Sequence, residues 1–144
     1  MTGTGTGTDT KLRYPEWSDL LSVGNAEIDE EHRRFLAQVA LVARMIDAGN
    51  LGLAKDTAAA MLALLRDHFK TEERVFALTS YPHAETHRTE HQVLLHMARN
   101  TLSDIRYRDD LDYVSLSLRY LAQMTVEHLI ETDMGYKPYL AAAG

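Results

Sequence analysis

Histidine and carboxylate residues recur at a spacing of four in two stretches of the sequence. His68 precedes Glu72 in the segment HFKTEE, and His87 precedes His91 in the segment HRTEH. Residues four apart on an α-helix lie about 40° from each other around the axis and one turn apart, so their side chains can reach one point. Imidazole and carboxylate groups are ligands for transition metals, so each pair is a candidate for part of a metal site.

Three further residues extend this set to five imidazoles and two carboxylates. His128 and Asp133 lie in HLIETD near the C-terminus, and His32 lies in IDEEH near the start. If two metal ions shared both carboxylates and one oxygen bridge, one ion would take three histidines and reach six ligands. The other would take two histidines and stop at five, which leaves a position open for a small molecule. The candidate ligands are His32, His68, Glu72, His87, His91, His128 and Asp133.

The expected burial of these residues distinguishes a metal site from the alternative that they are ordinary polar side chains. A single histidine on an apolar helix face is more often a hydrogen-bonded core residue than a ligand. Here, however, the candidates share the inner faces of several helices, and burying His68 and Glu72 without partners would cost several kcal/mol in lost hydration. A cation between the helices satisfies all of them together.

Other polar residues near the candidates lie off the predicted inner faces. His83 falls in a turn between helices, and His96 is displaced by about 140° from the His87–His91 stripe, so we assign both to the surface. We interpret Glu73, which faces away from His68, as a solvated charge.

The spacing of His128 and Asp133 does not fit a regular α-helix. Five residues correspond to about 140° of rotation, so either the two side chains flank a wide inner face or the helix contains a π-type turn. We predict that the helix widens between these two residues.

Apolar residues recur at intervals of three and four in four segments, and no segment alternates with period two. The predicted helices cover 25–49, 53–79, 84–106 and 110–134, preceded by an extended arm over 13–24. Four helices of similar length with short connections predict an all-α, antiparallel up-and-down four-helix bundle. Trp17 is the expected anchor of the arm, while Tyr136, Pro138 and Tyr139 close the chain.

Length and composition indicate one soluble domain. The 144 residues carry a net charge of −6, which argues against nucleic acid or an anionic membrane as a partner. There are no cysteines, and no apolar run approaches the roughly 18 residues of a membrane span. We expect a disordered Gly–Thr leader over 1–11, either a native tail or a linker remnant, and a bundle domain over 12–144. We expect a cytoplasmic monomer whose protein partner, if it has one, is unknown.

These motifs, in this order, resemble those of the hemerythrins, in particular the bacterial single-domain hemerythrins. The resemblance runs from Trp17 to about Leu140 and includes WSDLLSVGNAEIDEEH, HFKTEE, YPHAETHRTEH and HLIETD. All seven ligand positions of the family hold the expected residue types.

The resemblance implies two non-heme iron ions joined by both carboxylates and by an oxo or hydroxo bridge. One iron is six-coordinate, and the other is five-coordinate and binds O2 at its open position. The implied ligands are His87, His91 and His128 for the first iron, His32 and His68 for the second, and Glu72 and Asp133 as bridges.

The ligand types agree with this expectation. Neutral imidazoles give a metal less negative charge than carboxylates, so this set favours reversible O2 binding over splitting of O2. Di-iron bundles with Glu–x–x–His motifs have a more carboxylate-rich set. Zinc is the main alternative metal, but zinc sites usually stop at four ligands.

The sequence departs from the family just before His128, where a Trp–Leu pair is common. Met124 and Thr125 occupy these positions, and both are expected to line the O2 pocket. Met124 would form a looser wall. The Thr125 hydroxyl either bonds back to the carbonyl of Leu121, the slightly favoured alternative, or points into the pocket and shortens the lifetime of the O2 adduct.

Three classes of function remain open at this stage. The first is a non-enzymatic protein that stores or delivers O2. The second is a sensor domain that signals O2 or redox state through its N-terminal arm. The third is an enzyme acting on peroxide or nitric oxide, for which no acid–base residue beyond the ligands is evident. We therefore expect an O2-binding protein rather than an enzyme.

Overall fold

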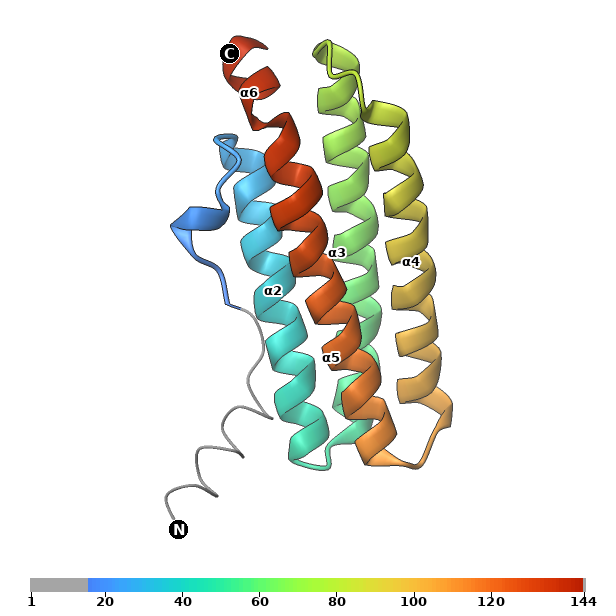
Figure 1. Ribbon diagram of the computed structural model, residues 1–144. Helices are drawn as coiled ribbons and strands as arrows, with labels where there is room; N and C mark the ends of the chain where they lie inside the picture. The colour runs from blue at the N-terminus through green and yellow to red at the C-terminus, as the bar shows by residue number, and fades with distance from the viewer. Residues whose placement is uncertain (1–15, 144) are drawn as a thin grey trace.

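The computed structural model describes residues 16–143, with side chains described to residue 140. All the regular elements within these residues are helices. Four antiparallel helices form a bundle, which confirms the predicted fold class (Figure 1). Within the described residues, none of the helices combines the length and the apolar character needed to cross a bilayer. The predicted leader, 1–11, lies outside the described residues. The elements are η1 (Asp19–Leu21), α2 (Ala26–Asp47), α3 (Leu51–Leu78), α4 (Ala84–Tyr107), α5 (Leu111–His128), η2 (Leu129–Asp133) and α6 (Met134–Ala143).

Polar side chains begin three of the long helices. The side-chain oxygen of Asn25 accepts from the amide of Ile28 at 3.0 Å, and Asn50 and Asp110 cap α3 and α5 in the same way. Such caps satisfy amides that have no partner within the helix. After α2 the chain turns at Gly49, where φ is 76°, a conformation that favours glycine. The bounds of α2, α3 and α4 agree with the first three predicted helices to within two residues at each end.

The last helix differs from the prediction. A single helix ending near 134 was expected, but α5 passes through the π-helical segment η2 and continues as α6 to Ala143. Pro138 lies inside α6 and removes one backbone donor without ending the helix. Tyr136, which is fully buried in the smaller apolar cluster, fixes the first turn of α6 to the bundle.

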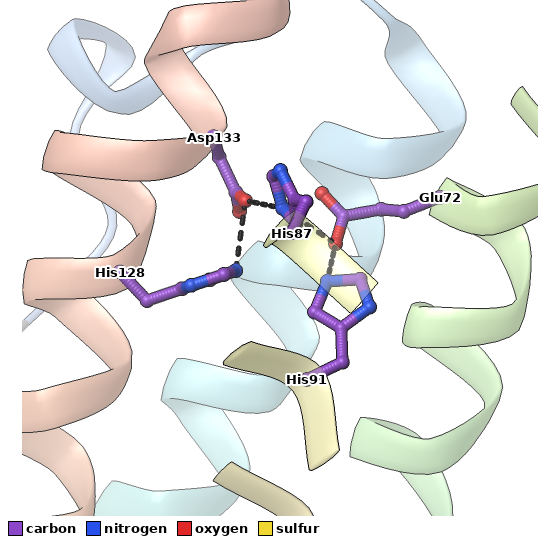
Figure 2. Close-up of side chains that lie close together, drawn as sticks. All are labelled: Glu72, His87, His91, His128 and Asp133. Carbon is purple, nitrogen blue, oxygen red and sulfur yellow. Dashed lines mark ion pairs between the residues drawn. The ribbon is translucent and has the colours of Figure 1, made fainter. Parts of the chain in front are cut away.

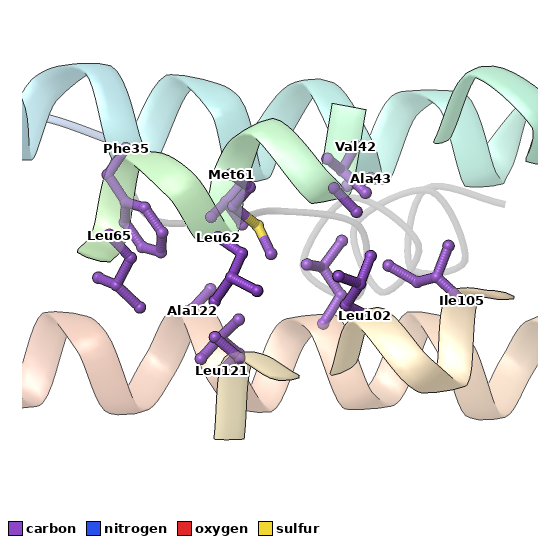
Figure 3. Packing of buried hydrophobic residues seen from close by; sticks show 14 of the residues in the cluster. Phe35, Val42, Ala43, Met61, Leu62, Leu65, Leu102, Ile105, Leu121 and Ala122 are labelled. Atoms are coloured by element: carbon purple, nitrogen blue, oxygen red, sulfur yellow. The ribbon is translucent and has the colours of Figure 1, made fainter. Parts of the chain in front are cut away.

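Two apolar clusters fill the bundle and leave a polar layer between them. The larger cluster includes Phe35, Leu65 and Leu121 and extends toward the α2–α3 and α4–α5 connections (Figure 3). The smaller cluster lies at the opposite end and comprises Val23, Ile28, Phe76, Tyr81 and Tyr136. Along α2 the order is Ile28, His32, Phe35, so the candidate ligands occupy the layer between the clusters.

The N-terminal arm is attached to α2 at two points. The guanidinium of Arg33 lies 5.1 Å from the centre of the Trp17 ring, in agreement with Trp17 as a contact point of the arm. Asp29 accepts hydrogen bonds from the Ser22 hydroxyl and from the Val23 amide, the latter at 2.9 Å. The arm is therefore bound to α2 one turn before His32.

Two leucines on α5 differ in burial, so the same substitution at each position separates the loss of packing from the change in helix propensity. Leu118 is fully buried, whereas Leu116 is 65% exposed. We expect Leu118→Ala to lower the free energy of unfolding of the metal-free protein by about 3 kcal/mol, through lost burial and a residual cavity. Leu116→Ala should change it by less than about 0.5 kcal/mol. Urea denaturation followed by circular dichroism measures both, and equal losses would contradict the packing described here.

Candidate metal centre

The seven sequence-predicted residues meet inside the bundle, and none of them is more than 7% exposed. Their ligand atoms form two overlapping groups in which all atoms lie within 4.8 Å of one another. Both groups contain the two carboxylates, so Glu72 and Asp133 lie between two sets of histidines. The groups are Glu72, His87, His91, His128 and Asp133, and His32, His68, Glu72 and Asp133.

The first group places three imidazoles around the carboxylates (Figure 2). His87 Nε2 lies 2.6 Å from an oxygen of Asp133, and His128 Nε2 lies 3.0 Å from the same atom. His91 Nε2 lies 2.9 Å from Glu72 Oε1. All three rings therefore present the same nitrogen, Nε2, to the space between the carboxylates.

The second group completes the arrangement from α2 and α3. His32 Nε2 lies 3.1 Å from Asp133 Oδ2, and His68 Nε2 lies 3.3 Å from Glu72 Oε1. The structure thus divides the histidines three to two around shared carboxylates. This is the division that the family resemblance implied.

These residues fit two metal ions because their inward-facing atoms face only one another. Apart from these close approaches to one another, the six atoms have no hydrogen-bond partner among the described residues, and all are buried. They are the Nε2 atoms of His68, His87, His91 and His128, with Glu72 Oε1 and Asp133 Oδ1. Buried polar atoms are normally satisfied, and leaving several unpaired in one place is costly. Imidazole nitrogen and carboxylate oxygen are donors that iron accepts. A pair of bridged cations would satisfy all of these atoms.

The predicted widening of the last helix is confirmed. Leu129–Asp133 forms a π-helical turn directly after His128. A π turn contains more residues than an α turn, so a residue five positions later returns to the same face. This turn brings Asp133 onto the side of the helix that carries His128, and both reach the site.

Three glutamates bind the outer nitrogens of the ligand histidines. The Nδ1 atoms of His68, His91 and His128 lie 2.9, 3.0 and 3.2 Å from carboxylate oxygens. With a carboxylate at Nδ1, that nitrogen carries the proton and Nε2 is free to bind a metal. The three pairs are His68 with Glu31, His91 with Glu73 and His128 with Glu90.

Each outer glutamate is itself held in place. Thr71 donates to Glu31 at 2.9 Å, and Thr132 donates to Glu90 at 2.8 Å. Arg88 lies 3.4 Å from Glu73. The orientation of the three imidazoles therefore depends on partners from neighbouring helices.

The interpretation of Glu73 as a solvated charge was wrong. Glu73 does face away from His68, but its carboxylate reaches His91 on α4. His83 and His96, assigned to the surface by the same reasoning, are exposed as predicted. Sequence spacing missed all three outer glutamates because each contacts a histidine on another helix, to which no local periodicity applies.

A buried tyrosine is a further residue that the sequence did not reveal. Tyr136 is fully buried, and its phenol donates a hydrogen bond to Glu72 Oε2. Burial and the two nearby carboxylates raise the pKa of Tyr136 far above its usual value. The phenol therefore stays protonated and serves as a donor to Glu72, one of the two carboxylates that both ligand groups share.

A small cavity adjoins the site on the side of His32 and His68. Its volume is about 10 Å³, which is room for the centre of one water-sized molecule. Thr125 lines the cavity, but its hydroxyl donates to the carbonyl of Leu121 at 2.8 Å, in agreement with the favoured alternative. Met124 lies outside, in a separate groove between α4 and α5. The lining residues are His32, Phe35, Leu36, Leu65, His68, Phe69, Thr125, His128, Leu129 and Asp133.

In the metal-free protein, neighbouring carboxylates hold protons on His68 and His128. Burial disfavours the His68 imidazolium, but Glu72 and Glu31 outweigh this and raise the pKa of His68 to about 10. Burial likewise opposes charge on His128, while Asp133 raises its pKa to about 9. Although burial raises the pKa of Asp133, hydrogen bonds with His128, His32 and His87 hold it well below its usual range.

This linkage predicts how the stability of the metal-free protein depends on pH. The raised pKa values stabilise the fold fully below pH 6.5, the ordinary value for histidine, and this contribution disappears as the pH rises through 9 and 10. We expect the free energy of unfolding to fall by on the order of 3 kcal/mol between these limits. Affinity for a divalent metal should instead rise with pH, because ligand histidines must lose protons.

Chemical denaturation across this pH range, with and without metal, tests the prediction. His68→Gln should reduce the loss of stability at high pH, and His96→Gln, at an exposed histidine, should leave it unchanged. Equal pH dependence in the two variants would contradict the assigned ion pairs.

Comparison with known proteins agrees with this geometry. The sequence profile of the hemerythrin HHE cation-binding domain matches residues 23–140. Hemerythrin-like proteins of Naegleria gruberi and Naegleria fowleri are each 26% identical to this chain over 129 residues, covering 86% of the chain and 92% of the relative. The matched region contains all seven residues that converge in the bundle, and the chain belongs to the hemerythrin HHE cation-binding domain family.

Proposed function

We propose that this protein is a non-heme di-iron protein that binds O2 reversibly, in the role of oxygen storage or delivery. The cavity beside His32 and His68 carries this proposal. It lies beside the group with fewer histidines, where the resemblance implies an open coordination position. Its volume of about 10 Å³ restricts the ligand to a very small molecule and excludes most organic substrates.

The walls of the cavity favour reversible binding over turnover. When bound, the iron pair would supply the electrons that O2 accepts on binding, and it would take them back when O2 leaves. Phe35, Leu36, Leu65 and Phe69 surround the cavity with apolar side chains that exclude water. The Thr125 hydroxyl donates its one hydrogen bond to the carbonyl of Leu121, so it does not donate to a ligand in the cavity. With water excluded and the hydroxyl occupied, the cavity offers few proton donors. Protonation of bound, reduced O2, which would release it as peroxide, is therefore disfavoured.

A sensor role is the second candidate, and one contact favours it. Asp29, one turn before His32 on α2, holds the arm through Ser22 and Val23. A shift of α2 at His32 would therefore reach the arm directly. In a sensor, the arm would change its protease sensitivity with redox state, whereas in a carrier it would not.

The absorption spectrum of the reduced, iron-loaded protein tests the proposed function. Admission of air should produce a visible charge-transfer band, and removal of O2 should abolish it over repeated cycles. His68→Ala should lose the band because the cavity-side group loses a ligand, while the exposed-site control His96→Ala should keep it. Permanent oxidation on the first exposure to air would contradict an O2 carrier.

A further inference from the structure

The buried phenol of Tyr136 has no evident role in reversible O2 binding. Its hydroxyl donates to Glu72, and its ring lies 5.3 Å from that of His87. Tyrosine can lose an electron and a proton to a strong oxidant, provided that a base accepts the proton. Glu72 Oε2 is such a base, already hydrogen-bonded to the phenol.

Two more tyrosines continue from Tyr136 to the surface. The ring centres of Tyr136 and Tyr81 are 5.9 Å apart, and those of Tyr81 and Tyr139 are 5.2 Å apart. The exposed fraction rises along this series, from 0% at Tyr136 to 9% at Tyr81 and 36% at Tyr139. The rings come from α6 and from the α3–α4 connection, which lie at the same end of the bundle (Figure 1). Neighbouring rings at such distances exchange electrons readily.

We propose that Tyr136, Tyr81 and Tyr139 form a redox relay that carries oxidising equivalents from the metal centre to the surface. The oxidant is a peroxide that reaches the centre, and the final donor is a small one-electron reductant such as ascorbate. The relay protects the ligand histidines from oxidation. It rests on the proposed iron centre but not on reversible O2 binding.

Electrons and protons balance at each step. Tyr136 gives one electron to the oxidised centre and its phenolic proton to Glu72. Tyr81 then gives one electron to the Tyr136 radical, which recovers its proton from Glu72, and the proton of Tyr81 passes to water. Tyr139 then gives one electron to the Tyr81 radical. Tyr81 takes up a proton from water, and Tyr139 releases its own proton to water. Ascorbate finally gives Tyr139 an electron and a proton, so two such passages supply the electrons that reduce hydrogen peroxide to water.

Packing alone does not require phenols at these positions. Phe76 belongs to the same cluster, with its ring centre 5.0 Å from that of Tyr136 and 5.3 Å from that of Tyr81. The cluster thus accommodates phenylalanine, and Tyr81→Phe should keep the fold while it removes the redox-active group. This variant separates a relay from an aromatic contact.

Exposed tyrosines elsewhere provide an internal control. Tyr107 and Tyr120 are 79% and 58% exposed, more than Tyr139, and Tyr107 lies at the opposite end of α4 from the relay. An oxidant acting from solution modifies the most exposed rings first. A relay instead modifies Tyr139 in preference to them.

The experiment treats the full-length, iron-loaded protein with hydrogen peroxide in the absence of reductant and locates oxidised tyrosines by peptide mass spectrometry. We expect oxidation at Tyr139 above that at Tyr107 and Tyr120, and its loss in metal-free protein and on addition of ascorbate. Tyr81→Phe should abolish oxidation at Tyr139 and increase it at Tyr136. The control Tyr120→Phe should leave oxidation at Tyr139 unchanged.

Oxidation that follows solvent exposure, or that persists at Tyr139 in Tyr81→Phe, overturns the relay. Metal analysis and the O2 spectrum distinguish this failure from that of the proposed function. A protein that fails to hold iron overturns both, whereas a protein without reversible O2 binding that still oxidises Tyr139 supports the relay alone.

Discussion

The structure depends on compensation of charge at the centre of an apolar bundle. Glu72 and Asp133 are almost completely removed from water, a position that an isolated carboxylate does not tolerate. Five imidazoles surround them, of which His68 and His128 are imidazolium partners without metal, and all five would be fellow ligands of a bound metal. The apolar clusters above and below this layer exclude solvent and so make the compensation necessary. Fold stability and metal binding are consequently two aspects of one set of contacts.

The fold and the inner ligand shell could be predicted from the sequence because both obey local helical periodicity. The pairs His68–Glu72 and His87–His91 follow the α-helical repeat directly. The irregular spacing of Asp133 predicted the π turn, since a buried carboxylate had to reach the same face as His128. A local deviation from the repeat was in this case as informative as the repeat itself.

The outer shell could not be predicted in this way. Glu31, Glu73 and Glu90 are partly exposed on their own helices, and each binds a histidine from a different helix. Such contacts depend on the relative rotation of packed helices, which the sequence of one helix does not specify. They also change the chemical argument, because a carboxylate at Nδ1 makes an imidazole a stronger donor than a neutral ring. The ligand set is therefore richer in electrons than its residue types suggest.

The π turn also fixes the register of everything that follows it. It acts as one inserted residue, and each residue of an α-helix corresponds to about 100° of rotation. If Leu129–Asp133 formed a regular α-helix instead, with no residue removed, α6 would be rotated by about this amount, and Asp133 and Tyr136 would both turn away from the bundle axis. A single backbone irregularity thus sets the positions of two groups at once, the carboxylate of Asp133 and the phenol that donates to Glu72.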